Sequence, residues 1–146
     1  MSTAIGASRE RVWRALTIPS ELIRWNDQIV SMVDPGPGYP RVGQRSRWRY
    51  TMGSVEITVT QTISRIDLGK RLQSEFCLGL FRFDETYSLQ TDPIEPKRTR
   101  VSLRVTASNS IAVVGGTIDR FEVRRLTTNL IDSRLRSVQK WCENNH

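Results

Sequence analysis

The residues best suited to chemistry are Glu85 and Tyr87, two positions apart in a stretch where apolar and polar side chains alternate. Residues two apart in a β-strand point to the same face, so both should face inward with Phe83 and Leu89. An unpaired carboxylate among apolar groups has a raised pKa, and Glu85 or Tyr87 could then assist proton transfer. The alternative is a structural ion pair, because Arg134 falls in the apolar sector of a predicted helix and is a possible partner of Glu85.

Other kinds of catalytic centre have little support in the sequence. The single histidine is His146, so neither a His-rich metal site nor a catalytic triad has an internal imidazole. Cys77 and Cys142 are too few for a disulfide framework. Asp84 and Glu85 are adjacent, so they face opposite sides of a strand and cannot share a site. No glycine-rich phosphate-binding fingerprint is present. We therefore expect no metal and no cofactor.

A long helix, predicted over residues 117–143, must position Arg134. At 100° per residue its apolar side chains fall on one broad face and its charged side chains on the other. Such a helix is about 39 Å long and should cover the apolar face of a sheet. Its last part, from Leu135, is predicted to anchor it. Its middle, where Thr127 and Arg134 lie among leucines, is predicted to form a pocket wall.

The part of the chain before this helix predicts the sheet. A short strand over 2–6 precedes two short helices, the first capped by Ser8 and the second begun by Pro19. Alternating stretches between residues 29 and 107 then predict successive strands joined by short turns, an antiparallel meander with one buried face. The alternation breaks at Ile66, as a β-bulge would cause. Loop 34–43, with Tyr39 at its tip, is either a flap over a pocket or an ordinary proline-stiffened connection.

Composition and charge limit the class of protein. The chain has 146 residues, 38% of them hydrophobic and 25% charged, which fits one globular domain over 1–146. No apolar run is long enough to span a membrane and the first residues lack a signal-peptide core, so we expect a cytoplasmic protein.

The net charge of +7 raises the alternative of nucleic-acid binding. Arg45, Arg47 and Arg49 should form a row on one strand face, while Trp48 and Tyr50 point to the other. Platforms for single strands carry aromatic and basic groups on the same surface. This separation favours a solvated outer face, with no specific nucleic acid and general attraction of polyanions as a secondary interpretation.

Several stretches carry a resemblance that covers nearly the whole chain. They are ASRERVWRALTIPSELIRWN after the first strand, GPGYPRVGQRSRWRY around the glycine-bearing loop, and the pair ETYSLQTD and RTRVSL in the late strands. With the order of elements, they resemble the polyketide cyclase/dehydrase-like branch of the START-like (SRPBCC) helix-grip superfamily. The resemblance implies an α+β fold, in which an antiparallel curved sheet of six or seven strands wraps around the C-terminal helix. It also implies a cavity that accepts lipids, sterols, aromatic polyketides or other apolar molecules.

The cavity should lie between the inward sheet residues and the apolar face of the helix. Its predicted lining, besides Glu85, is Trp48, Tyr50, Val59, Phe76, Phe83, Tyr87, Leu103, Leu126, Thr127, Leu130 and Arg134. These residues predict binding of a small, largely apolar molecule, with an acidic one as an option because the chain is basic. The alternatives are a metal-free cyclase or dehydratase that uses Glu85 and Tyr87 in the same cavity, and an interaction module like the chaperone activators of this fold. The oligomeric state is left open.

Overall fold

The computed structural model describes residues 1–33, 38–52, 54–79, 81–107 and 120–145, and for residues 52 and 120–127 it describes the backbone alone. In chain order the described elements are β1 (Ser2–Ile5), α1 (Arg9–Thr17), α2 (Pro19–Trp25), β2 (Ile29–Met32), β3 (Arg45–Met52), β4 (Val55–Asp67), β5 (Arg71–Leu78), β6 (Phe81–Thr91), β7 (Thr99–Ala107) and α3 (Arg120–Asn144).

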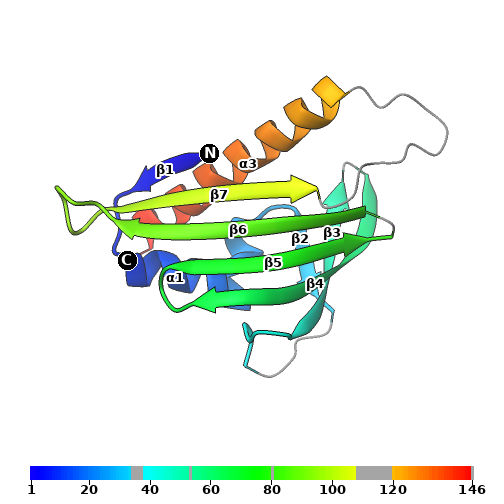
Figure 1. The fold of residues 1–146 in the computed structure, drawn as a ribbon, viewed down its shortest axis with the longest axis horizontal. Coiled ribbons are helices and arrows are strands. Elements are labelled where there is room, and N and C mark those ends of the chain that lie inside the picture. Colours follow the sequence, from blue (N-terminus) through cyan, green and yellow to red (C-terminus); the bar gives the residue numbers. More distant parts are fainter. Residues whose placement is uncertain (34–37, 53, 80, 108–119, 146) are drawn as a thin grey trace.

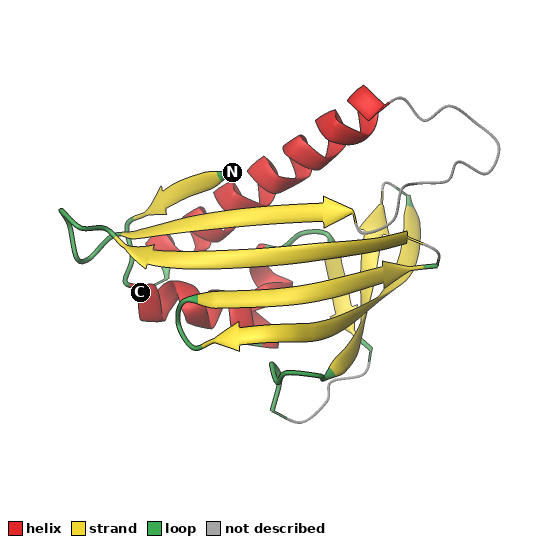
Figure 2. Ribbon diagram, viewed as in Figure 1, coloured by secondary structure: helices red, strands yellow, loops and turns green. Residues whose placement is uncertain are grey.

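The strands form one antiparallel sheet in the order β1-β7-β6-β5-β4-β3-β2, with seven strands in the described residues. Consecutive strands from β2 to β7 pair with their neighbours, and β1 closes the other edge against β7. Figures 1 and 2 show the sheet curving in front of the three helices, which all lie on one side of it. This arrangement confirms the predicted helix-grip fold.

Strand periodicity separates an inner face, toward the helices, from an outer face. On β3, Trp48 is only 2% exposed, whereas its neighbours Arg47 and Arg49 are exposed. The pairing of β4 with β5 shifts between Ile63 and Arg65, so the predicted bulge lies just before Ile66. A bulge adds one residue to one strand and so resets the alternation.

The C-terminal part of α3 holds the helix to the rest of the protein. Leu135, Val138 and Cys142 are buried in the core at intervals of three and four residues, which places them on one face of the helix. Trp141 adds a polar contact, donating its indole N–H to the Glu21 carboxylate of α2 over 2.9 Å. The helix begins at Arg120, and residues 117–119 of the predicted span lie outside the described residues.

The two short helices form as the sequence predicts. The Ser8 hydroxyl accepts a hydrogen bond from the Arg11 backbone N–H at 3.2 Å, and Pro19 occupies the first turn of α2. The Trp25 indole donates to the Ala15 carbonyl over 2.7 Å, which fixes α2 against α1. Neither these helices nor the described part of α3 is long and apolar enough to cross a membrane.

Candidate functional site

An inner hollow of about 30 Å³ lies between the sheet and the helices. Its walls combine aromatic, aliphatic and polar side chains from β2 to β6 and all three helices. The lining residues are Leu16, Leu22, Trp25, Asn26, Ile29, Tyr39, Trp48, Tyr50, Gln61, Leu72, Ser74, Phe76, Glu85, Tyr87 and Arg134. This volume is enough for one or two water molecules.

An ion pair between α3 and β6 crosses the hollow. Arg134 Nη1 donates to Glu85 Oε2, and the two side chains are 12% and 11% exposed. Of the two alternatives for Glu85, an unpaired carboxylate or an ion pair with Arg134, the structure shows the ion pair. The two residues are far apart in sequence, so their pairing depends on α3 lying across the inner face of the sheet.

The ion pair influences the tyrosines beside it. Burial raises the pKa of Tyr50 to about 12, the Glu85 charge adds to this rise and Arg134 opposes it. Burial and the Glu85 charge raise the pKa of Tyr87 further still, and the neighbouring Arg134 opposes this rise. Burial alone would lower the pKa of Arg134, but the Glu85 carboxylate outweighs it and the pKa is raised. At neutral pH the hollow thus contains a guanidinium cation and neutral phenols.

A second cluster of polar side chains is joined by hydrogen bonds to the Gln61 amide. Its Oε1 accepts from Trp48 Nε1 at 2.7 Å and from the Tyr39 hydroxyl at 3.0 Å, and its Nε2 donates to Ser74 Oγ at 2.9 Å. Tyr39 also packs edge-on against Trp48, with ring centroids 5.7 Å apart. The end of loop 34–43 is therefore tied to the inner face of the sheet, whereas residues 34–37 lie outside the described residues.

One donor in the hollow remains unused. Arg134 Nε is buried and has no hydrogen-bond partner among the described residues. A buried donor without a partner costs about 1–3 kcal/mol, so a group that accepts a hydrogen bond there stabilises the site. Carbonyl, carboxylate and water oxygens are such acceptors.

The predicted site residues divide into three groups. Trp48, Tyr50, Phe76, Glu85, Tyr87 and Arg134 come together around the hollow. Val59, Phe83, Leu103 and Leu130 are not part of its described lining; Val59 and Leu103 are buried, and Phe83 lies opposite Phe76 in the β5–β6 pair. The side chains of Leu126 and Thr127 lie outside the described residues.

Several lining residues were not among the predicted site residues. Gln61 and Ser74 occupy inward positions of β4 and β5, where a polar side chain in an apolar row is a detectable signal. Leu16, Leu22, Trp25, Asn26 and Ile29 form the wall on the α1–α2 side. Their spacing predicts only burial, because helix packing alone determines which buried residues border a hollow.

A curved antiparallel sheet that wraps around a long C-terminal helix, with two short helices after the first strand, defines the START-like helix-grip class. The match of residues 1–143 makes the assignment more specific. The chain belongs to the family described as polyketide cyclase / dehydrase and lipid transport. No curated protein matches the sequence significantly.

Solved structures of distant sequence share the fold. A START superfamily protein from Mycobacterium smegmatis superposes with a TM-score of 0.77 at 12% identity, covering 100% of this chain and 97% of that one. TTHA0849 from Thermus thermophilus gives 0.70 at 21% identity, covering 97% and 94%. DynU16, from the dynemicin biosynthetic locus, gives 0.69 at 14% identity, covering 98% of this chain and 46% of that one. At such identities the likeness shows the fold alone.

Proposed function

We propose that this protein binds a small, largely apolar molecule in the inner hollow, with one polar group of the ligand accepting a hydrogen bond from Arg134. The unpartnered Arg134 Nε among aromatic walls is the observation that carries the proposal. Apolar walls with a few converging polar groups are the usual composition of small-molecule sites. Membership of a family described by cyclase, dehydrase and lipid-transport functions supports the same interpretation.

Binding requires the hollow to open. A volume of about 30 Å³ is far below the roughly 300–1,000 Å³ of typical ligand sites. The contacts that must break are those by which Tyr39 closes the hollow, namely its hydrogen bond to Gln61 and its packing against Trp48. The ligand therefore stabilises a wider arrangement of loop 34–43 through its higher affinity for that arrangement.

The polar group of the ligand should be uncharged. The basic composition suggested an acidic ligand, but the Glu85 carboxylate already neutralises Arg134. A ligand carboxylate would have to displace Glu85 or lie beside it, and like charges in a buried site repel strongly. A ketone, ester or amide carbonyl can accept from Arg134 Nε while the ion pair stays in place.

Thermal unfolding in the presence of fatty acids, fatty-acid methyl esters, sterols and aromatic polyketides tests the proposal. A ligand that binds only the folded state raises its stability by about 2.7 kcal/mol at one hundred times its Kd. We expect a rise in melting temperature with at least one class, and a larger one for methyl decanoate than for decanoic acid. No response to any class would contradict the proposal.

A substitution that fills the hollow identifies the site. Ser74→Leu places extra volume against Gln61 and should weaken binding at least tenfold in calorimetric titration. Thr58→Leu is the matched control, because Thr58 is exposed on the neighbouring strand β4. Equal affinity of both variants would place the ligand elsewhere.

Catalysis is the second candidate, favoured by one contact. Tyr87 shares Arg134 with Glu85, so a neutral phenol and a carboxylate meet at one cation. In a ring closure of the cyclase kind, Glu85 would take the proton from a carbon next to a carbonyl, and the enolate formed would attack a second carbonyl carbon of the same molecule. Tyr87 would protonate the resulting alkoxide, and the proton held by Glu85 would then return to Tyr87. Mass spectrometry of a linear polyketone incubated with the protein tests this. Product formation should be lost in both Tyr87→Phe and Glu85→Gln. If both variants formed as much product as the parent protein, the catalytic role would be excluded.

A further inference from the structure

The outer face of the sheet, away from the helices, carries a groove of about 720 Å³ over β5, β6 and β7. We name it the outer groove. Residues that line it include Arg71, Asp84, Thr86, Ser88, Ser102 and Arg104. It shares no residue with the lining of the inner hollow, because alternate residues of a strand point to opposite faces.

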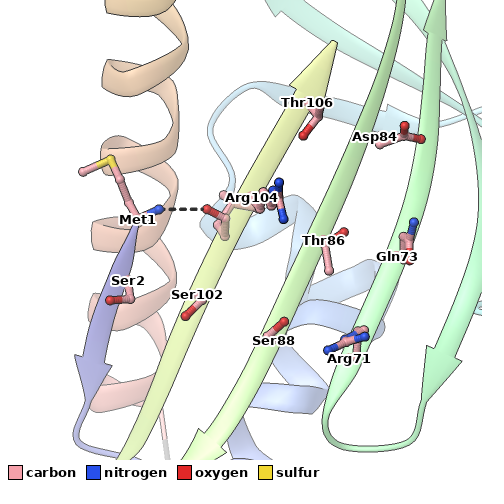
Figure 3. A pocket seen from close by; sticks show the side chains of 11 residues that line it. Met1, Ser2, Arg71, Gln73, Asp84, Thr86, Ser88, Ser102, Arg104 and Thr106 are labelled. Atoms are coloured by element: carbon pink, nitrogen blue, oxygen red, sulfur yellow. Dashed lines mark hydrogen bonds between the residues drawn. The ribbon is translucent and has the colours of Figure 1, made fainter. Parts of the chain in front are cut away.

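Strand register places the two arginines on either side of a strip of hydroxyl groups. Arg71 of β5 lies opposite Ser88 of β6, and Arg104 of β7 lies opposite Thr86 of β6. From strand spacing and rise, the two arginine Cα atoms are about 12 Å apart. In Figure 3 both arginine side chains reach from their strands toward β6, so their guanidinium groups border the Ser88 and Thr86 hydroxyls.

The charges of these arginines are not neutralised by neighbours. The side chains of Arg71 and Arg104 have no ion pair or hydrogen bond with another described residue. Elsewhere on the sheet Arg49 pairs with Glu56, and Arg65 pairs with Asp67. Two free guanidinium groups over hydroxyl donors form a site for a phosphate group, since guanidinium binds phosphate oxygens in a bidentate manner.

Asp84 makes one end of the outer groove acidic, in contrast to the part that Arg71 and Arg104 border. It precedes Thr86 by two residues on β6 and also lines the groove. A carboxylate would repel a phosphate at that end but accepts hydrogen bonds from ligand hydroxyl groups. None of the described lining residues is aromatic, so a nucleobase has no surface on which to stack. These features select a phosphate attached to a polyhydroxylated carbon skeleton.

We propose that the outer groove binds a phosphorylated polyol, with the phosphate held by Arg71 and Arg104 and a ligand hydroxyl held by Asp84. The ligand chemistry is the same whether the polyol phosphate is free or is the head group of a lipid. This site goes beyond the proposed function of the inner hollow and does not depend on it.

Calorimetric titration of the full chain tests the site with myo-inositol 1-phosphate, inorganic phosphate and, in a separate arm, phosphatidylcholine vesicles containing phosphatidylinositol. Binding of inositol phosphate in solution identifies a free ligand, and binding of the vesicles alone identifies a lipid head group; both support the proposal. Binding of neither overturns it.

Two sets of variants separate the site from general attraction by a basic protein. Arg71→Gln with Arg104→Gln should lower affinity for inositol phosphate at least tenfold. Arg45→Gln with Arg82→Gln removes the same charge from exposed positions of the sheet outside the groove lining and should lower it less than twofold. Equal losses would overturn the proposal.

Asp84→Asn distinguishes a hydrogen bond between Asp84 and the polyol from a general effect of charge. Removal of a negative charge should strengthen binding of inorganic phosphate. It should weaken binding of inositol phosphate several-fold, because the charged acceptor is lost and one of its two oxygens is replaced by an N–H donor. Stronger binding of both probes would show that no hydroxyl contact exists and would overturn the polyol assignment.

Discussion

Arg134 of α3 donates to Glu85 of β6 across the inside of the protein, 49 residues apart in sequence. Both side chains are nearly buried, at 12% and 11% exposure. Because Arg134 also borders the tyrosines of the hollow, this pair connects the stability of the fold with the polarity of the candidate site. Because both charges are removed from water, either one without its partner would be an uncompensated buried charge.

Loss of one partner should therefore destabilise the protein strongly. We expect Arg134→Met to lower the free energy of unfolding by about 3–5 kcal/mol, because Glu85 is left as a buried charge without a cation. Arg136→Met is the matched control; Arg136 lies two residues along the same helix, is 78% exposed and pairs with Asp132, so the loss should stay below about 1 kcal/mol. Urea denaturation measures both.

Simultaneous replacement of both partners should recover part of this loss. In Arg134→Met with Glu85→Leu no buried charge remains, so the double variant should be more stable than Arg134→Met alone. Equal unfolding free energies for Arg134→Met and Arg136→Met would show that the pair has no such role.

Alkaline pH should unfold the protein through its tyrosines. All three, Tyr39, Tyr50 and Tyr87, line the inner hollow, and burial raises the pKa of each, that of Tyr50 to about 12. Phenols of the unfolded chain ionise near 10, so the unfolded state loses protons first. Their contribution to stability is full below about pH 10 and is lost as the pH rises toward the folded-state values.

The near-ultraviolet absorbance of phenolate reports this ionisation. In the folded protein we expect almost no phenolate at pH 10.5, followed by a cooperative rise on unfolding; in concentrated urea all three tyrosines should titrate near pH 10. If one third of the total phenolate signal of the folded protein appeared in a titration step with its midpoint near pH 10, one tyrosine would lie in water, which would contradict the buried arrangement.

Acid pH should loosen the anchor of α3. Burial alone would raise the pKa of Glu21, but hydrogen bonds from Arg11, at 2.6 Å, and Trp141, at 2.9 Å, outweigh it and the pKa is lowered. The stabilisation by Glu21 is therefore present above the unfolded-state pKa of about 4.3 and is lost as the pH falls through the lower folded-state pKa.

Glu21→Gln should accordingly be less stable than the parent protein at pH 7, and the difference in melting temperature should shrink toward pH 3. Glu10→Gln is the control, because Glu10 is exposed on α1 and should show little difference at either pH. A difference between Glu21→Gln and the parent that stays constant from pH 7 to pH 3 would mean that Glu21 ionisation does not contribute to the anchor.

Much of the fold was predictable because it depends on local periodicity. The alternation on β6 placed Asp84 and Glu85 on opposite faces, and the structure has Asp84 in the outer groove and Glu85 in the inner hollow. The apolar spacing of Leu135, Val138 and Cys142 likewise predicted the buried face of α3. Such patterns repeat every two or 3.6 residues and are visible in the sequence itself.

The candidate site was predictable only in part, for a reason that Tyr39 and Leu22 illustrate. Tyr39 was expected at a loop tip, yet it is half-buried and donates to Gln61. Leu22 lies in the second short helix, where its apolar character predicts only packing, yet it borders the hollow. Neither position follows from local spacing, because each depends on where a loop or a short helix comes to lie against the sheet.

The sequence by itself therefore determined which side chains face inward, where the helices and strands lie, and that Glu85 and Arg134 are polar groups on apolar faces. Tertiary structure alone decided that these two residues pair, that Gln61 joins Trp48, Tyr39 and Ser74, and that a single donor, Arg134 Nε, remains unpartnered at the hollow among the residues described. The physical reason is distance along the chain. Periodicity orients a side chain relative to its own helix or strand, whereas a contact between distant residues requires that separate elements be packed in one particular arrangement.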